Sequence, residues 1–257
     1  MEFGSRNHRL DFESRVREQF SVRSAKFDAS TNWVTDEKLI HAHIDLAGDA
    51  SGEALDLCCG TGQIGRALKA KGWNVKGLDV CLDMIEISSR YFSVTQGKAE
   101  KMPFESNCFN LVVCRQAFHF LDIKDTLSEI NRVLVQQGIF IASLTTPFSD
   151  VDKDWLYEIH RTKQPLLLKF YTTQDLIQEL KAKDFLIQEI RTLVVRESIN
   201  RWMDYAPELN QEVREKVLSM VQNAPLAYKK LHRVQIVDGE IFEDWNWIVL
   251  KTVSSKK

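Results

Sequence analysis

The chain contains 257 residues, of which 44% are hydrophobic and 27% are charged, and both proportions are typical of a folded globular protein. Its 34 basic and 36 acidic residues give a formal charge of −2, which argues against a dedicated nucleic-acid-binding protein, because such proteins usually carry a basic excess. No apolar run approaches the about 20 residues that a membrane span needs.

The beginning of the chain and its cysteines bear on processing and compartment. Residues 1–5 look like a cloning remnant, and residues 1–30 contain no apolar stretch suited to a secretory signal. The five cysteines are odd in number and include no CxxC pair, which favours reduced thiols over a disulfide framework or a zinc site. We therefore predict a cytoplasmic protein without a bound metal.

Helices are predicted for the N-terminal segment, residues 6–50. A charged amphipathic helix fits residues 10–27, with Val16, Phe20 and Phe27 on its apolar side. A second helix fits residues 35–47, with Thr35 as its N-cap.

From residue 51 onward, short apolar runs alternate with helical patterns. The predicted strands are residues 54–59, 75–78, 94–97, 110–114, 139–144 and 185–196, and the predicted helices are residues 64–71, 81–91, 123–134 and 173–183, the last capped by Thr172 or Thr173. Strands that alternate with helices indicate βαβ units, a parallel sheet and right-handed crossovers. We assign residues 51–198 to this core.

The last part of the chain combines helices with two further strand patterns. Residues 199–232 look helical and amphipathic, residues 234–242 look like a strand pair with a turn at 238–239, and residues 247–253 look like a strand. We interpret residues 199–238 as a helical cap inserted over one end of the sheet, and residues 239–257 as the return of the chain to the core.

A glycine-rich turn follows the first predicted strand. Residues 55–65 read LDLCCGTGQIG, and glycine permits the tight reversal and the close approach of a ligand to the backbone. The next helix presents free N–H groups and the positive end of its dipole to this turn. Asp79 ends the second strand, 19 residues beyond Gly60, where a carboxylate can accept hydrogen bonds from both hydroxyls of a ribose. These features predict a site for an adenosine-containing cofactor.

The glycine pattern alone leaves a second cofactor class open. Gly60, Gly62 and Gly65 match GxGxxG, which also occurs in oxidoreductases that bind NAD or FAD. Asp56 argues against that class, because a buried strand does not accept an acid without a reason and dinucleotide-binding strands are normally apolar up to the first glycine. An acid four residues before Gly60 suits a cofactor with a positive end, such as an amino acid ammonium group.

At this point the sequence resembles the class I S-adenosylmethionine (SAM)-dependent methyltransferases. Residues 56–62 (DLCCGTG), 77–80 (GLDV), 97–104 (GKAEKMPF), 109–112 (FNLV) and 129–134 (EINRVL, followed by Gly138) resemble the family's motifs in the family's order. The resemblance covers residues 16–145 and is strongest to the ubiquinone/menaquinone-type small-molecule methyltransferases (methyltransferase type 11).

The resemblance implies a doubly wound, Rossmann-like α/β fold with a seven-stranded, mostly parallel sheet, an antiparallel last strand and N-terminal helices over the cofactor. It implies SAM as cofactor and S-adenosylhomocysteine (SAH) as its product. The positions that would contact the cofactor are Asp56, Cys58, Gly60, Thr61, Gly62, Asp79, Val80, Met84, Lys98, Ala99, Glu100 and Arg115. Two of them depart from the pattern: Cys58 replaces the usual first glycine, and Lys98 replaces an acid that would meet the adenine amino group.

The acceptor side is less sharply defined. His119 follows the fourth strand and would lie at the mouth of the site, either as a general base or as a structural histidine packed between its neighbouring phenylalanines. Candidate acceptor contacts, which core packing also explains, are Trp155, Tyr171, Trp202 and Tyr205. We expect the acceptor between His119 and the helices of residues 199–232.

Missing motifs narrow the acceptor class. The fourth strand is not followed by Asn/Asp-Pro-Pro-Tyr, no Pro-Cys pair occurs, and no acidic triad suits a metal-dependent reaction. A small organic molecule, methylated on carbon, oxygen or nitrogen, is therefore predicted as the acceptor, without a nucleic-acid partner. The alternatives are an NAD- or FAD-dependent oxidoreductase and a non-catalytic binding protein of the same fold.

Overall fold

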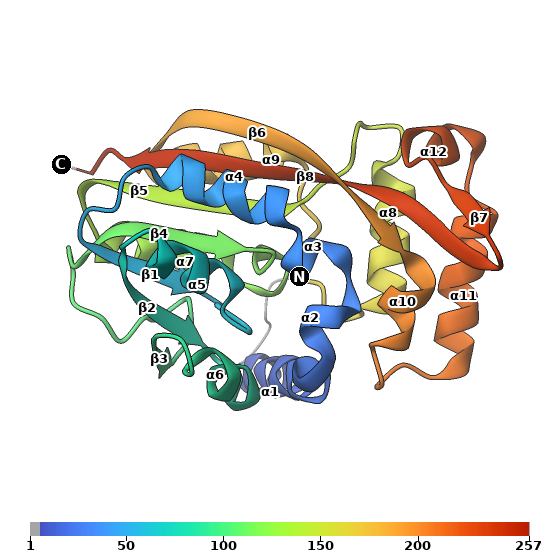
Figure 1. Cartoon of the computed structure of the whole chain (residues 1–257), viewed down its shortest axis with the longest axis horizontal. Coiled ribbons are helices and arrows are strands. Elements are labelled where there is room, and N and C mark those ends of the chain that lie inside the picture. Colours follow the sequence, from blue (N-terminus) through green and yellow to red (C-terminus); the bar gives the residue numbers. More distant parts are fainter. Residues whose placement is uncertain (1–5, 257) are drawn as a thin grey trace.

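The computed structural model describes residues 6–256 and centres on one twisted sheet (Figure 1). The sheet has eight strands in the order β3-β2-β1-β4-β5-β8-β6, and β7 pairs with β8 beside this path. The strands are β1 Glu53–Leu57, β2 Asn74–Asp79, β3 Ser93–Gln96, β4 Phe109–Arg115, β5 Leu134–Thr145, β6 Phe185–Ser198, β7 Gln235–Val237 and β8 Glu240–Ser254. The cloning remnant predicted at residues 1–5 lies outside the described residues.

The pairing confirms the predicted fold class. Strands β3, β2, β1, β4 and β5 run parallel to their neighbours, and β8 lies antiparallel between β5 and β6. The eighth strand is the short β7, which forms a hairpin with β8 through a turn in which Asp238 and Gly239 both have positive φ. The two strand patterns predicted at residues 240–242 and 247–253 are one continuous strand.

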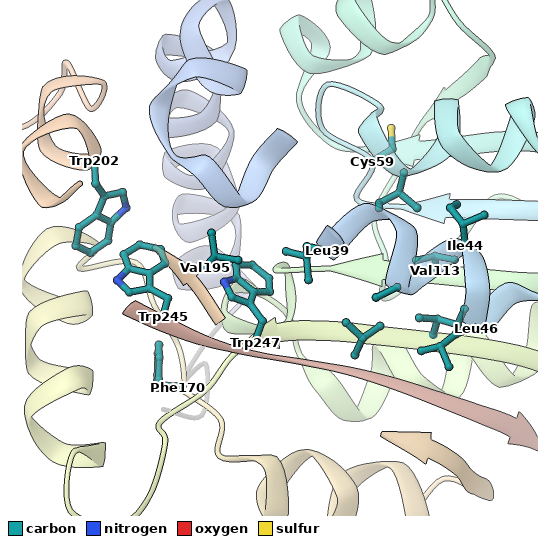
Figure 2. Close-up of a cluster of buried hydrophobic side chains, with 14 of the residues drawn as sticks. Leu39, Ile44, Leu46, Cys59, Val113, Phe170, Val195, Trp202, Trp245 and Trp247 are labelled. Atoms are coloured by element: carbon teal, nitrogen blue, oxygen red, sulfur yellow. The ribbon is translucent and has the colours of Figure 1, made fainter. Parts of the chain in front are cut away.

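Helices cover both faces of the sheet. The helix α4 (Glu37–Ala47) and the helix α5 (Gln63–Ala70) pack on one face, and α7 (Ile123–Val133) and α9 (Thr173–Lys181) pack on the other. Alternate residues of the central strands point into the two layers, since Val113 belongs to the first apolar cluster and Val112 to the second. Figure 2 shows how the first cluster runs from Leu46 of α4 to tryptophans at the far end of β8.

The N-terminal segment is broken into several helices. They are α1 (Arg6–Arg23), a short 3-10 turn (Ser24–Lys26), α2 (Phe27–Ser30), α3 (Asn32–Thr35) and α4. The predicted N-cap of α4, Thr35, is wrong, because Thr35 still belongs to α3. Asp36 takes the role, and its carboxylate accepts a hydrogen bond of 2.7 Å from the Leu39 N–H.

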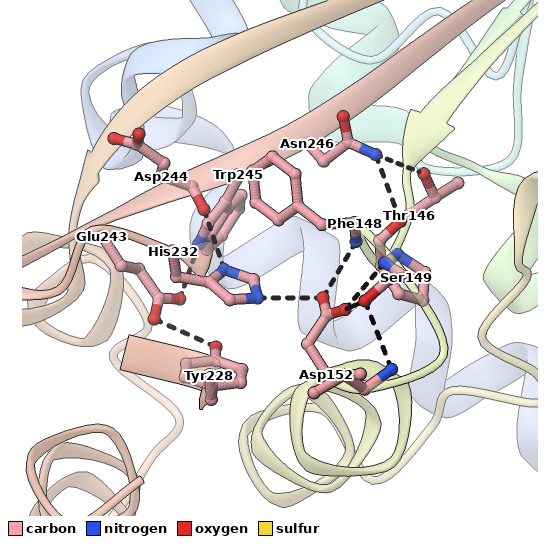
Figure 3. A network of polar contacts seen from close by, with 12 residues as sticks. Thr146, Phe148, Ser149, Asp152, Tyr228, His232, Glu243, Asp244, Trp245 and Asn246 are labelled. Carbon is pink, nitrogen blue, oxygen red and sulfur yellow. Dashed lines mark hydrogen bonds and ion pairs between the residues drawn. The ribbon is translucent and has the colours of Figure 1, made fainter. Parts of the chain in front are cut away.

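The helix α8 (Lys153–Lys163) was not predicted from the sequence. Its buried side includes two basic residues, His160 and Lys163, which interrupt the apolar periodicity by which an amphipathic helix is predicted. The carboxylate of Asp152 accepts hydrogen bonds from the N–H groups of Phe148 and Ser149 and contacts His232 Nε2 at 3.0 Å (Figure 3). This contact fixes the beginning of α8 against the C-terminal part of the chain.

The segment predicted as a cap contains three helices between β6 and β7. They are α10 (Ile199–Asp204), α11 (Gln211–Gln222) and α12 (Leu226–Leu231). Because β6 runs in the same direction as β5, α10 begins at the edge of the sheet where β1, β2, β4 and β5 end. Helix α11 packs against α8, and both lie beyond this edge (Figure 1).

The remaining helix on the sheet is α6 (Leu82–Ser88), which follows β2. Among residues 6–256, no helix combines the length and the apolar character that crossing a membrane would require.

Candidate active site

A large cavity opens at the carboxyl ends of β1, β2 and β4. It encloses about 1210 Å³ of empty space including its open mouth. Asp56 at the end of β1, Asp79 at the end of β2 and Arg115 at the end of β4 line it from below, and side chains of α1 line it from above. The α1 side chains are Phe12, Glu13, Val16 and Phe20.

The turn between β1 and α5 is as tight as its glycines suggest. Gly60 and Gly62 have φ angles of 52° and 87°, in the left-handed region that glycine adopts freely. Cys58 also has a positive φ of 55°, which costs a residue with a Cβ atom about 1–2 kcal/mol. A hydrogen bond with Cys114 and burial raise the pKa of the Cys58 thiol well above its ordinary value, so this thiol is not a ready nucleophile.

Asp79 joins the glycine turn to the beginning of α6. Its Oδ2 atom accepts a hydrogen bond of 2.8 Å from the Gly60 N–H, and its Oδ1 atom accepts one of 2.9 Å from the Cys81 N–H. Burial raises the pKa of Asp79, although these backbone hydrogen bonds oppose the shift. Each carboxylate oxygen has a second lone pair, so Asp79 can still accept hydrogen bonds from two neighbouring hydroxyl groups of a ligand.

Asp56 and Arg115 influence each other electrostatically on the cavity floor. The Asp56 Oδ2 atom accepts a hydrogen bond of 2.7 Å from the Gly65 N–H, and burial raises the Asp56 pKa to about 7 despite the nearby Arg115. Burial lowers the pKa of Arg115 to about 10. The guanidinium donates hydrogen bonds to the Trp33 and Val34 carbonyls, at 3.3 Å and 3.2 Å, and therefore ties α3 to the end of β4.

Two further carboxylates hold α2 and α3 over the cavity. Asp28 of α2 accepts hydrogen bonds from the Thr61 hydroxyl at 2.5 Å and from the Gln63 amide at 2.7 Å. Glu197 of β6 accepts hydrogen bonds from the N–H groups of Asn32 and Trp33, at 2.7 Å and 2.8 Å, and so satisfies the N-terminus of α3. The Trp33 ring is thereby fixed at the edge of the cavity.

The lining of this cavity is acidic. Its four carboxylates are Glu13, Asp56, Asp79 and Glu100, whereas its two cations are Lys98 and Arg115. Burial raises the pKa of Asp56 and of Asp79, and a ligand that carries positive charge would favour their ionised forms.

Comparison with known proteins gives this cavity a family context. A family model described as "Methyltransferase domain" matches residues 55–142, the stretch from β1 through most of β5. Residues 55–142 are thus similar to a methyltransferase domain. The matched stretch contains the glycine turn, Asp79 and Arg115, so it supplies the floor of the cavity, which is roofed by helices that precede it.

Relatives and solved structures agree with this assignment. The chain is 28% identical to the uncharacterized methyltransferase YcgJ of Bacillus subtilis over 126 residues, which cover 45% of this chain and 50% of YcgJ. It is 27% identical to the demethylmenaquinone methyltransferase of Staphylococcus aureus over 219 residues, which cover 79% of this chain and 88% of that protein. It spans about half the length of the two Bacillus subtilis methyltransferases that it matches. The crystal structure of YcgJ superposes with a TM-score of 0.77 at 19% identity, covering 85% of this chain and 98% of YcgJ, and therefore has the same fold.

Most of the cofactor positions predicted for the methyltransferase domain surround the cavity. The lining includes Asp56, Cys58, Gly60, Thr61, Asp79, Val80, Met84, Lys98, Ala99, Glu100 and Arg115. Gly62 is not part of the lining and serves as the N-cap of α5. Lys98 forms an ion pair with Glu13 of α1, so the cation that departs from the family pattern brings a carboxylate to this part of the cavity.

The prediction that His119 lies at the mouth of the cavity is wrong. His119 is 2% exposed, lines neither this cavity nor the neighbouring one, and stacks on Phe170 with ring centroids 5.0 Å apart. Its Nδ1 atom lies 3.0 Å from the Lys169 carbonyl oxygen, and burial lowers its pKa to about 4. The turn after β4 directs the side chain into the core, which fits the structural alternative.

The four candidate acceptor residues divide into two pairs. Trp202 and Tyr205 line a second, smaller cavity beside the first, whereas Trp155 and Tyr171 line neither and pack in the core. The resemblance implies N-terminal helices over the cofactor, but the lining residues of α1–α3 were not among the predicted site residues. The apolar side predicted for residues 10–27, with Phe20 and Phe27, is the sequence signal that could identify them.

Proposed function

We propose that this protein transfers a methyl group from SAM to a small organic acceptor. The observation that carries the proposal is the cavity at the strand ends, which Asp56 and Asp79 line from neighbouring strands and where they could accept hydrogen bonds from a cationic, ribose-containing cofactor. An NAD or FAD molecule brings negatively charged phosphates and fits this lining poorly. SAM carries positive charge on its sulfonium and ammonium groups and supplies a methyl group that is already activated for transfer.

The residues of the cavity would bind and orient this cofactor. Asp56 would accept hydrogen bonds from the ammonium group, and Asp79 would accept hydrogen bonds from the ribose hydroxyls. Met84 of α6 would cover the adenine. Lys98 replaces the acid that would meet the adenine amino group, and the Glu13 carboxylate, which forms an ion pair with Lys98, could take the place of that acid. In-line displacement depends mainly on positioning and on the exclusion of water, which the roof formed by α1–α3 provides.

The relatives support a small acceptor. The Staphylococcus aureus relative is named as a demethylmenaquinone methyltransferase. A further solved structure, the geranyl diphosphate C-methyltransferase of Streptomyces coelicolor in complex with Mg²⁺, geranyl diphosphate and SAH, shares the fold at 13% identity with a TM-score of 0.58, covering 85% of this chain and 78% of that one.

Calorimetry with four ligands tests the cofactor. Titration with SAM and with SAH should give saturable heats, and titration with NAD or FAD should give none; the reverse pattern would replace the methyltransferase proposal by an oxidoreductase. Incubation with SAM labelled in its methyl group and a panel of small acceptors, followed by mass spectrometry, then tests transfer. Tight SAM binding without transfer to any acceptor class would favour the non-catalytic alternative.

A further inference from the structure

A second cavity adjoins the first and has the opposite charge. It encloses about 570 Å³ of empty space including its mouth and lies between α1–α3, α8 and α10. Among the described residues that line it, the charged side chains are Arg23 and Lys163, and none is a carboxylate. Because an acidic cavity and a basic cavity lie side by side, the two are suited to different ligands.

The two cavities share a wall of aromatic side chains. The residues that line both are Phe20, Phe27, Trp33, Gln116 and Phe120. Phe20 meets Phe120 edge-on at a centroid distance of 5.3 Å, and Phe27 meets Trp33 edge-on at 6.1 Å. A flat apolar molecule held in the second cavity would therefore pack against the same side chains that border the first cavity.

Lys163 is the most unusual residue of the second cavity. It is only 3% exposed, and its Nζ atom lies 4.6 Å from the centre of the Trp202 ring. Among the described residues, no carboxylate or carbonyl accepts a hydrogen bond from this ammonium group. Burial, together with Arg23, lowers the pKa of Lys163 well below its ordinary value. A negative charge in the cavity would supply the missing partner and favour the protonated amine.

Arg23 is partly neutralised within the protein. It is 6% exposed, forms an ion pair with Glu208, and donates a hydrogen bond of 3.1 Å to Gln164 Oε1. Glu208, which also opposes the lowering of the Lys163 pKa, is not part of the lining, so Arg23 and Lys163 are the two basic groups that face the cavity. Buried cations without enough carboxylates are costly, and an anionic ligand offsets that cost.

The wall that carries Lys163 is held rigidly. At its beginning, α8 is anchored by the contact between Asp152 and His232 (Figure 3), and along its length it packs on α11. Trp202 and Trp245 lie beside each other at this end of the core (Figure 2), with ring centroids 5.0 Å apart. The ammonium group is thus positioned before any ligand arrives, which increases the affinity that an ion pair can give.

We propose that the second cavity is the methyl-acceptor site and that it selects acceptors with an aromatic or unsaturated body and one anionic group, a carboxylate or a phosphate, which Lys163 and Arg23 bind. This inference rests on the proposed function, because only a methyltransferase needs a site for a methyl acceptor. The anionic group anchors one end of the molecule at α8, and the other end reaches the shared aromatic wall. The reacting atom then faces the cofactor cavity.

Four small probes test the anion preference without any turnover. Benzoate, phenyl phosphate, benzyl alcohol and benzylamine are titrated into protein saturated with SAH, and quenching of tryptophan fluorescence reports binding, since Trp33, Trp202 and Trp245 line the cavity. Benzoate or phenyl phosphate should bind at least about tenfold more tightly than the neutral and cationic probes. The better of the two anions shows whether the site is built for a carboxylate or a phosphate.

Matched lysine variants assign the preference to the cavity. Lys163→Met should abolish the tenfold preference and leave the affinity for SAH unchanged, whereas Lys216→Met, on the exposed side of α11, should change neither. Equal binding of all four probes by the wild type, or an undiminished preference in Lys163→Met, overturns the proposal. If Lys163→Met does not fold, the wild-type probe series alone decides.

The same titrations separate this proposal from the proposed function. If the anions bind only when SAH is absent, the two cations hold the cofactor's own carboxylate, and the acceptor proposal is overturned while the methyltransferase proposal stands. If SAH does not bind the wild type at all, the methyltransferase proposal fails, and the anion preference is measured with the protein alone.

Discussion

Replacing Asp56 by asparagine should stabilise the protein at high pH and weaken cofactor binding. In the unfolded chain this carboxyl ionises near its ordinary pKa of 3.8, whereas burial raises the pKa to about 7 in the folded protein. The folded state therefore binds more protons between these values, and its stability falls as the pH rises through them. At about 1.4 kcal/mol per pKa unit, the cost reaches about 4 kcal/mol above pH 7, and about 2 kcal/mol of it arises between about pH 5.5 and pH 8.

Asparagine keeps the contact that Asp56 makes and removes the charge. Its side-chain oxygen can still accept the hydrogen bond from the Gly65 N–H, and the attraction of Arg115 for the ionised form is already contained in the pKa of about 7. The free energy of unfolding of Asp56→Asn, relative to wild type, should therefore increase by about 2 kcal/mol from about pH 5.5 to about pH 8. Affinity for SAH at the higher pH should fall about 10- to 100-fold, because a charge-assisted hydrogen bond contributes about 1.5–3 kcal/mol.

Urea unfolding at the two pH values and calorimetry with SAH measure both effects. Asp49→Asn, in the exposed loop before β1, is the control and should change neither quantity. A stability difference between wild type and Asp56→Asn that is the same at both pH values would show that the buried carboxyl is already ionised at the lower one. An unchanged SAH affinity would show that the ammonium group is held elsewhere.

Four further substitutions test the cavity, the turn after β4 and the support of α8. Asp79→Ala should weaken SAH binding about 10- to 100-fold. Lys98→Ala should weaken it less, because it removes a partly exposed ion pair that contributes about 1 kcal/mol or less. A larger loss of SAH affinity for Lys98→Ala than for Asp79→Ala in calorimetry would contradict this prediction. His119→Ala should lower the free energy of unfolding by about 2–4 kcal/mol and leave SAH affinity unchanged, because the side chain is buried in the core. If the variant is as stable as the wild type but no longer transfers methyl groups, His119 acts as a general base. His232→Ala should lower the free energy of unfolding by about 1–3 kcal/mol, because the buried Asp152 carboxylate loses one of its hydrogen-bond partners. Adding Asp152→Asn should recover part of the loss, and no recovery in urea unfolding would refute the pairing.

The cofactor cavity could be predicted because its floor follows the order of the chain. In a parallel sheet every strand delivers its carboxyl end to one edge, so Asp56, Asp79 and Arg115 meet there although they are far apart in the sequence. The resemblance implied N-terminal helices above this floor, but their individual contacts could not be predicted in the same way. Glu13 reaches Lys98 only because α1 crosses the open edge, and no local pattern encodes that crossing. The predicted position of the His119 side chain was wrong for a related reason. His119 does follow β4, but the direction of its side chain depends on the turn.

The second cavity shows why the acceptor is harder to predict than the cofactor. Its walls include side chains of α1, α8 and α10, and these helices do not meet at one edge of the sheet as the strand ends do. Its central residue, Lys163, lies on α8, a helix that was not predicted from the sequence. A lysine on a helix is usually solvated, whereas this one is buried and lies over the Trp202 ring of α10. The positive charge of the second cavity is therefore a product of tertiary structure, whereas the negative charge of the first lies largely on strand-end acids. A family that keeps the strand ends and varies the helices beyond them can keep one cofactor while it changes the acceptor.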